Sequence, residues 1–404
     1  MIDTSLIITL YQGNQYLPYL LQIAEENFRN MRRQMGRDCE LILINDEPGN
    51  KLSVEEGENS WGEIVVCNLK ENRGIHGSRQ LGAKLARGRY LIFLDQDDKI
   101  TGNYLISQRK KIGNCDAVVC NGYMTEYGKE AKWYIYASVG EQGKVAILEN
   151  YLTEGNLIIS PGQVLLIKEA IPKIWMKKAM RANGADDFLL WVLMLFSGKT
   201  FAINTEKLYV HIGHEKNVSN NKAIMRASIK EAIQIMRESS VSLGIQKEQL
   251  EKLEQWWEKN KRLSVEIEKI FKDWKYLESR NISLADFFRE QGSERIAIYG
   301  FGNIGRRLFC EFQDTDVNVV CGIDRQADKI FMEGLPIVKF EDARTAEYMQ
   351  QVDAVVITLR ESFLNIKKMI EEEYENIKIF SLEDIIRELL MEFKKQEKCM
   401  EKER

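Results

Sequence analysis

Residues 72–98 read NRGIHGSRQLGAKLARGRYLIFLDQDD, and the last part of this stretch decides the fold. An apolar run at residues 90–94 follows soon after Gly88 and ends in three acids within four positions. A short apolar run bounded in this way is typical of a strand buried in a parallel sheet. Open α/β sheets bind ligands at the carboxyl ends of their strands, so we expect the acids at a ligand site.

The three acids are Asp95, Asp97 and Asp98. Carboxylates crowded together repel one another unless a cation lies among them. Magnesium or manganese, held by one or two carboxylates and by substrate phosphates, fits this pattern. The simpler interpretation is a polar turn after a strand, because an isolated Asp-x-Asp is common. The residues that precede the acids favour a metal–diphosphate site.

Several segments occur together in an order that resembles one enzyme family. Asn-x-Gly, Ser-Arg-Gln, Ala-x-Gly-x-Tyr and Phe-Leu-Asp-x-Asp-Asp, all within residues 72–98, are similar to the central signature of family-2 glycosyltransferases. The other matching segments are residues 6–20 (first strand and helix), 40–50 (second strand and acidic turn), 184–188 (late acidic pair) and 209–219 (closing histidine-containing segment). The resemblance covers residues 1–220 and implies an α/β domain with the GT-A fold of nucleotide-diphospho-sugar transferases.

Composition sets ordinary bounds. A chain of 404 residues with 44% hydrophobic and 29% charged residues is typical of a soluble globular protein of two or three domains. A net charge of −4 gives no reason to expect nucleic-acid binding. The sequence enters a strand without a signal segment, and its longest apolar run, residues 188–196, is too short to span a bilayer. Seven scattered cysteines without Cys-x-x-Cys spacing are expected to be reduced thiols, and a cytoplasmic location follows.

The pattern of the chain changes twice along its length. Residues 1–220 alternate strands and helices, which predicts a mostly parallel sheet with helices on both faces. Residues 221–292 show only helical apolar stripes with mixed charges opposite, and we expect a solvated helical connector. A membrane-lying or oligomerising helix pair is an alternative that the mixed charges disfavour. Residues 293–404 predict a small Rossmann-like α/β domain.

The resemblance implies roles for the residues at the strand ends. Asp97 would be the direct metal ligand, and Asp95 would lie nearer the ribose of the donor as well as serving the metal. Arg79 would hold the donor and orient the aspartates; the alternative is a surface salt bridge worth little energy. The expected donor-binding residues are Thr9, Tyr11, Asp46, Arg79, Asp95 and Gln96. Glu47-Pro48-Gly49 replaces the usual Gly-Ser pair after Asp46, which leaves the nucleobase open.

The late acidic pair supplies the expected catalytic group. By resemblance, Asp187 is the general base that takes the acceptor proton, and Asp186 supports it. Acids at a helix N-terminus also serve as caps and dipole partners, which is the alternative. A base aimed from the side opposite the diphosphate predicts single displacement with inversion.

Two histidines and one glycine pair are further candidates around this site. His211 and His214 lie near Asn217-Val218-Ser219, and His214 is the expected third metal ligand, although loop histidines often only bond backbone. His76 is either a neighbour of the donor or a helix-start residue. Gly162 and Gln163 are expected at an edge of the acceptor site.

The third segment carries a glycine loop between a strand and a helix. Its spacing is Gly300-x-Gly302-x-x-Gly305, and Asp324 follows 19 residues after Gly305, at the end of the next strand. These residues predict a second nucleotide site, with phosphate at the helix N-terminus and ribose on the acid. Glycines also allow close strand–helix packing with no ligand, and that alternative stays open.

These patterns together predict an inverting glycosyltransferase that depends on Mn²⁺ or Mg²⁺. It would use a nucleotide-diphosphate sugar and a carbohydrate or lipid-linked saccharide acceptor, in bacterial surface polysaccharide or glycoconjugate assembly. The alternatives are a non-catalytic nucleotide-sugar binding or scaffold protein and an NAD(P)-dependent enzyme acting through the C-terminal domain. The sugar, nucleobase, acceptor, linkage, oligomeric state and attachment to the inner face of the membrane are left open.

Overall fold

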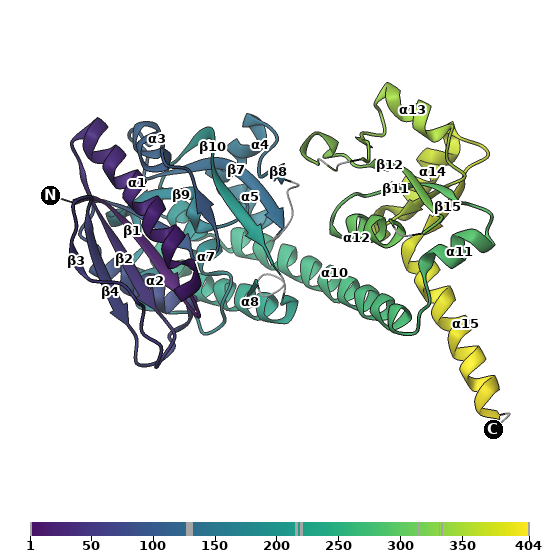
Figure 1. Cartoon of the computed structure of the whole chain (residues 1–404), viewed down its shortest axis with the longest axis horizontal. Helices are drawn as coiled ribbons and strands as arrows, with labels where there is room; N and C mark the ends of the chain where they lie inside the picture. Colours follow the sequence, from purple (N-terminus) through teal and green to yellow (C-terminus); the bar gives the residue numbers. More distant parts are fainter. Residues whose placement is uncertain are drawn as a thin grey trace. The chain divides into compact units, whose positions relative to one another are not determined.

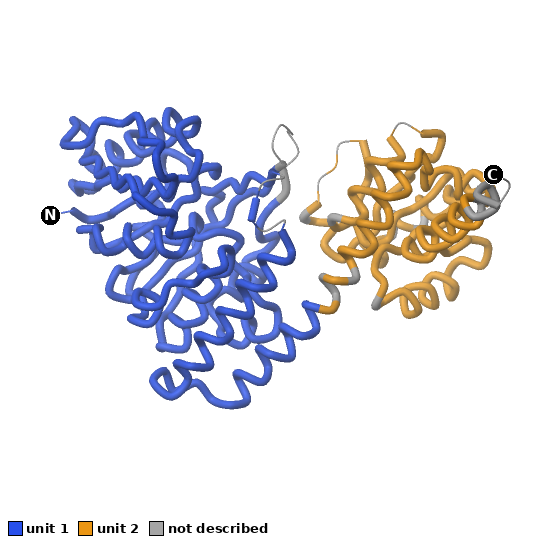
Figure 2. Tube along the Cα trace, turned by 90° about the horizontal axis from the view of Figure 1, so that it is seen from below, with its two compact units in different colours: residues 1–261 blue, residues 262–404 orange. Residues whose placement is uncertain are grey.

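The computed structural model describes residues 2–126, 132–214, 217–218, 221–313, 315–330, 332 and 334–402. The chain forms two compact units, Met1–Lys261 and Arg262–Arg404 (Figure 2). The boundary between the units falls inside residues 221–292, the segment expected to be a helical connector. Ile233 and Met236 belong to the core of the first unit, whereas Trp274 and Leu277 belong to a core of the second. The helical segment is therefore shared between two cores.

A single large sheet forms the centre of the first unit (Figure 1). Its parallel part has the order β4-β2-β1-β5, made of β4 (Glu63–Asn68), β2 (Asp38–Asn45), β1 (Ile2–Leu10) and β5 (Tyr90–Asp95). Strands β1, β2 and β5 are apolar and almost fully buried in their centres, as the sequence predicts for a parallel sheet covered on both faces, whereas β4 is only partly buried. In register, Thr9 of β1 lies opposite Asp95 of β5. The polar ends of the strands therefore meet at one edge of the sheet.

The sheet continues with mixed strand directions. Beyond β5 it has the order β9-β7-β10-β6, with β9 antiparallel to both β5 and β7, and β10 parallel to β7. The strands are β9 (Val164–Ile167), β7 (Ala117–Glu126), β10 (Phe201–Gly213) and β6 (Lys99–Ile100), with β3 (Gly57–Glu58) and β8 (Lys132–Tyr134) pairing at β4 and β7. The long strand β10 brings the histidine-containing segment back beside the Asp95 turn through its pairing with β6.

Helices pack against this sheet. They are α1 (Leu17–Met35), α2 (Gly74–Leu85), α3 (Tyr104–Lys111), α4 (Val139–Gly143), α5 (Leu148–Glu154), α6 (Lys173–Lys177), α7 (Asp186–Phe196), α8 (Lys222–Glu238), α9 (Ser240–Leu243) and α10 (Lys247–Ser279). Helix α2 lies very close to β1, since a Cβ added at Gly82 would overlap the Ile7 side chain. This close approach sets the position of Arg79, which lies one helical turn earlier on α2.

The second unit is a five-stranded parallel sheet in the order β13-β12-β11-β14-β15. Its strands are β11 (Arg295–Tyr299), β12 (Asn318–Ile323), β13 (Ile337–Val338), β14 (Ala354–Ile357) and β15 (Lys378–Ser381). Its helices are α11 (Leu284–Glu290), α12 (Asn303–Phe312), α13 (Ala343–Met349), α14 (Phe363–Glu373) and α15 (Leu382–Lys402). The order matches the doubly wound arrangement, in which the chain reverses between β11 and β14.

Across the described residues of both units, none of the helices has the length and apolar character needed to cross a lipid bilayer.

Candidate active site

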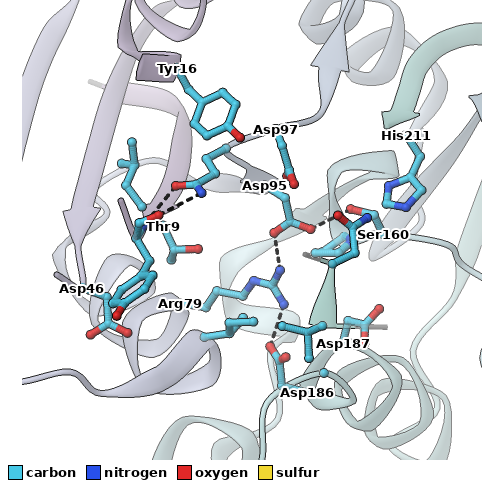
Figure 3. A pocket seen from close by; sticks show the side chains of 18 of the residues that line it. Thr9, Tyr16, Asp46, Arg79, Asp95, Asp97, Ser160, Asp186, Asp187 and His211 are labelled. Carbon is cyan, nitrogen blue, oxygen red and sulfur yellow. Dashed lines mark hydrogen bonds and ion pairs between the residues drawn. The ribbon is translucent and has the colours of Figure 1, made fainter. Parts of the chain in front are cut away.

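A cavity of about 460 Å³ opens at the carboxyl ends of β1, β2 and β5. It is lined by the expected donor-binding residues, the acidic pair and two of the metal candidates: Thr9, Tyr11, Asp46, Arg79, Asp95, Gln96, Asp97, Asp186, Asp187 and His214. Figure 3 shows labelled side chains from strand ends (Thr9, Asp46 and Asp95), from helix α2 (Arg79) and from helix α7 (Asp186 and Asp187) around this cavity. Parallel strands present their carboxyl ends at one edge, which explains how residues so distant in sequence meet.

Arg79 links the two acidic groups of the cavity (Figure 3). Its guanidinium group donates from Nη1 to Asp186 Oδ2 at 2.8 Å and from Nη2 to Asp95 Oδ1. Burial alone would lower the pKa of Arg79, but the carboxylates of Asp186 and Asp95 outweigh burial and raise it. With 6% of its surface exposed, Arg79 is not the surface arginine of the alternative interpretation. It fixes the start of α7 against the end of β5.

Ser160 and Asp98 support the Asp95 carboxylate. The Ser160 hydroxyl lies 3.1 Å from Asp95 Oδ2 and 3.2 Å from Asp98 Oδ2, and its single proton can go to only one of them at a time. Asp98 is buried and accepts from the Tyr209 hydroxyl and from the backbone N–H of Ile212. Asp98 therefore organises the turn after β5, and it does not line the cavity. Ser160 was missed in the sequence, where only its neighbours Gly162 and Gln163 stood out.

Asp97 and His214 form the part of the cavity that fits a divalent cation. The Asp97 carboxylate is hydrogen-bonded to His214 Nε2, and both residues line the cavity. Burial, together with the charges of Asp98 and Asp95, raises the pKa of Asp97. A carboxylate oxygen and an imidazole nitrogen are suitable ligands for Mn²⁺, and Mg²⁺ takes one or two carboxylates with phosphate oxygens and waters.

The described residues contain no group of three or more His, Cys, Asp or Glu side chains arranged for a metal ion. Asp97 and His214 would thus provide two ligands, and diphosphate oxygens and water would complete the shell. His211 also lines the cavity, with Nδ1 3.0 Å from Asp98 Oδ1. Burial alone would lower the pKa of His211, but its hydrogen bond to Asp98 and the charges of Asp98, Asp95 and Asp97 together raise it. The Asp98 carboxylate, hydrogen-bonded to Nδ1, holds the His211 ring in one orientation.

The acidic pair stands at the start of α7. Asp186 is engaged by Arg79, whereas Asp187 Oδ2 accepts a hydrogen bond from Asn156 Nδ2 at 2.9 Å. Burial and the neighbouring Asp186 carboxylate raise the pKa of Asp187 to about 7, although Arg79 opposes the shift. A carboxylate with a raised pKa is a better proton acceptor near neutral pH. These contacts go beyond the helix-capping role of the alternative interpretation.

The donor side of the cavity is built on backbone contacts. The Gln96 side-chain amide pairs with both the N–H and the C=O of Tyr11 at 3.0 Å, which ties the end of β1 to the turn after β5. Asp46 accepts from the backbone N–H of Arg73 at 2.6 Å, and burial raises its pKa. Gln12 has a φ of +51°, a left-handed conformation that asparagine tolerates better.

Three other candidates of the first unit do not line the cavity. His76 Nδ1 accepts from the backbone N–H of Met180, so Nε2 carries the proton and donates to the Trp175 carbonyl at 3.1 Å. Gln163 is buried and bonds Ile159 and Cys120, while Gly162 O accepts from the Tyr104 hydroxyl. Ser160 and Pro161 line the cavity in their place, as do Asn217 and Val218. Ser219 lies outside the described residues.

The glycine loop of the second unit is held by protein contacts. Gly300 has a φ of +92°, and a Cβ at Gly305 would overlap the Gly300 carbonyl oxygen. The Asp324 carboxylate accepts from the backbone N–H groups of Phe301 and Gln326, both at 2.8 Å. These contacts support the packing interpretation of Gly300 and Gly305. At Gly302 a Cβ would meet no atom of the described residues within 4 Å, so its role in a second nucleotide site stays a prediction.

Comparison with known families and proteins adds a separate line of information. Residues 5–175 match the family described as glycosyl transferase family 2, and residues 292–380 match the family described as C2185-like, N-terminal. The acidic pair Asp186–Asp187 lies beyond the first match, so its assignment depends on the geometry of the cavity.

Three curated relatives match parts of the chain. The poly(ribitol-phosphate) beta-N-acetylglucosaminyltransferase TarP of Staphylococcus aureus is 25% identical over 201 residues, which is 47% of this chain and 58% of that protein. The minor teichoic acid biosynthesis protein GgaB of Bacillus subtilis is 29% identical over 24% of this chain and 11% of its own length. The putative glycosyltransferase EpsH of B. subtilis is 28% identical over 32% of this chain and 36% of its own. The matches thus span less than two thirds of each relative.

Among solved structures, S. aureus TarS 1–349 in complex with UDP-GlcNAc aligns with a TM-score of 0.40 and 14% identity. The alignment covers 62% of this chain and 78% of that one.

Proposed function

We propose that this chain, whose residues 5–175 belong to a family-2 glycosyltransferase domain with the GT-A fold, transfers a sugar from a nucleotide-diphosphate donor to an acceptor hydroxyl. One observation carries the proposal. Buried Arg79 joins the aspartates after β5 to the acidic pair of α7 in one cavity, so the groups for donor and acceptor face the same space. A transferase needs both sets of groups within reach of a single anomeric carbon.

The donor would lie along the ends of β1, β2 and β5. Thr9, Tyr11 and Asp46 line the side expected for the nucleoside, and Asp95 lies between them and the acidic pair. Asp97 and His214 would hold Mn²⁺ or Mg²⁺, which when bound supplies positive charge to the leaving diphosphate. Arg79 keeps Asp95 oriented and adds positive charge inside the cavity, where electrostatic stabilisation is strong because water is excluded.

Asp187 would act on the acceptor. Its carboxylate takes the proton from the acceptor hydroxyl as that oxygen bonds to the anomeric carbon, and the bond from this carbon to the diphosphate oxygen breaks. The diphosphate leaves with the bonding electron pair. Displacement in a single step from the opposite face inverts the anomeric configuration. Asn156 steadies Asp187 for this task through its 2.9 Å hydrogen bond.

The names of the relatives support an acceptor in bacterial surface polymers. Two of the three compared proteins are named for teichoic acid biosynthesis or for a poly(ribitol-phosphate) acceptor, and the third is a putative glycosyltransferase. The acceptor class proposed for this chain is therefore a carbohydrate or a lipid-linked saccharide, which such an enzyme would meet at the cytoplasmic face of a membrane.

The test is transfer, or donor hydrolysis, across a set of nucleotide sugars with Mn²⁺ or Mg²⁺. Asp97→Ala should abolish turnover while its melting temperature stays near that of the wild type. Asp38→Ala, which removes an exposed aspartate paired with Arg32, is the matched control and should keep full activity. Unchanged turnover in Asp97→Ala would contradict the mechanism, and donor binding without product would favour a scaffold protein.

A further inference from the structure

A short loop, residues 181–185, leads directly into the acidic pair and is held by a neighbouring helix. The backbone N–H of Arg181 lies 3.0 Å from both carboxylate oxygens of Glu231 on α8, and the N–H of Ala182 donates to Glu231 Oε2 at 2.9 Å. Hydrogen bonds to a charged acceptor are stronger than those between neutral groups. Glu231 therefore fixes the beginning of the loop.

Ser228, one turn earlier on α8, fixes the end of the same loop. Its Oγ accepts from the backbone N–H of Ala185 at 2.9 Å and donates to the Ala182 carbonyl at 2.9 Å. Ser228 is fully buried, so both bonds are shielded from water. Between these anchors, Gly184 has a φ of +120°, and a Cβ there would overlap the sulfur of Met225. The loop therefore contacts α8 at its beginning, at Gly184 and at its end.

Helix α10 packs against residues that adjoin Asp187 and Asn156. The Trp256 ring lies 5.9 Å from the Phe188 ring between centroids, and Phe188 directly follows Asp187. A Cβ at Gly155 would overlap the Trp256 ring, so this ring packs directly on the turn before Asn156. Asn156 is the residue that donates to Asp187. Trp256 therefore restrains both Asp187 and its hydrogen-bond partner.

We propose that Ser228, Glu231 and Trp256 are positioning residues for the Asp187 base. All three lie on helices beyond the residues that match the family, and none of them lines the cavity. The inference rests on the proposed function, because it assigns these helices a part in the transfer step. A base displaced by about 1 Å can cost about 100-fold in rate, so the geometry of this loop governs turnover.

The experiment compares Glu231→Ala, Ser228→Ala and Trp256→Leu with the wild type. We expect kcat to fall by about 10- to 100-fold in each variant, with the donor KM unchanged, because donor contacts come from β1, β2 and β5. Glu231→Gln should recover part of the loss, since its amide oxygen still accepts from the loop. Arg237→Gln is the control: Arg237 also lies on α8, and the change breaks its ion pair with Glu254 of α10 without touching the loop, so kcat should stay at the wild-type value.

Amide hydrogen exchange of residues 181–187 is measured in parallel and needs no activity. Faster exchange in Glu231→Ala and Ser228→Ala, but not in Arg237→Gln, supports the positioning role. Unchanged exchange in these two variants overturns the positioning role. Faster exchange also overturns it if kcat stays at the wild-type value, or if only KM is raised. A wild-type protein that turns over no donor would instead refute the proposed function, and the exchange data would still decide whether α8 holds the loop.

Discussion

Arg79 forms ion pairs with two carboxylates that come from distant parts of the chain. It is buried and bonds Asp95 and Asp186, so its removal would leave both acids in a cavity with lowered access to water. Breaking a buried ion pair from one side costs more than the pair contributes, because an uncompensated charge remains. The single arginine thus serves both stability and the orientation of the site.

Arg79→Met should lower the free energy of unfolding by about 3–5 kcal/mol and abolish turnover. Arg79→Lys should retain more stability but little activity, since one ammonium group cannot bond both carboxylates in a fixed fork. Urea unfolding and donor turnover measure the two effects. Arg29→Met, which breaks an exposed pair with Glu25, should cost less than about 1 kcal/mol. Equal losses in the Arg29 and Arg79 variants would contradict this account.

Asp187 should give the reaction a characteristic pH dependence. Only the ionised carboxylate accepts a proton, and burial beside Asp186 raises its pKa to about 7, so kcat should rise with pH through this value. Stability should change in the opposite sense. The pKa of Asp187 is higher in the folded than in the unfolded protein. Its contribution to the free energy of unfolding is therefore fully present below the ordinary aspartate pKa and is lost as the pH rises through the folded pKa.

Asp187→Asn separates these two effects. The variant should lose turnover and should be at least as stable as the wild type above pH 7, since no charge is forced into the buried site. Melting temperatures and kcat measured as functions of pH test both statements. A flat kcat profile in the wild type, or an Asp187→Asn variant that melts lower at high pH than the wild type, would speak against Asp187 as a buried base.

At the scale of single elements, the sequence predicted what depends on local pattern. The apolar run before Asp95 predicted β5 and the place of the acids, and the alternation of elements predicted the parallel part β4-β2-β1-β5 but not the antiparallel pairing of β9 with β5 and β7. The roles of Ser160, Ser228 and Asn156 could not be predicted, because each depends on a hydrogen bond to a residue 31 to 65 positions away. A single polar residue without a motif gives no signal of such a partner.

The contact between α2 and β1 offers a test at this scale. A Cβ at Gly82 would overlap the Ile7 side chain, so Gly82→Ala should push α2 away from the sheet and move Arg79 with it. We expect a loss of about 1–3 kcal/mol in unfolding free energy, together with lower kcat. Gly143→Ala, at the end of α4 with open space around its Cβ, should instead be neutral or gain up to about 1 kcal/mol. Urea unfolding of both variants decides the point.

At the scale of the whole molecule, composition and periodicity predicted two α/β parts with helices between them in the sequence. They did not predict which hydrophobic core each of these helices packs into. The apolar stripe of α8 has the same sequence pattern whether the helix packs against another helix of a connector or against the first unit. In the structure its buried residues pack into the core of the first unit, and so do Leu253 and Trp257 of α10. The boundary of the first unit consequently falls at Lys261, well beyond the expected residue 220.

A pair of truncations tests this boundary. The fragment 1–261 retains α8 and the apolar residues of α10 that complete the core, so it should fold cooperatively and keep donor turnover. The fragment 1–220 lacks Ile233, Met236, Leu253 and Trp257, and each buried side chain of this kind contributes about 1.5–3 kcal/mol. Together they amount to about 6–12 kcal/mol, which is comparable to the whole stability of a typical domain (about 5–15 kcal/mol), so the shorter fragment should aggregate or stay unfolded. Thermal melts and gel filtration distinguish the two fragments. A well-folded, active 1–220 fragment would show that α8 and α10 are dispensable, and that the loop before Asp186 holds its shape without them.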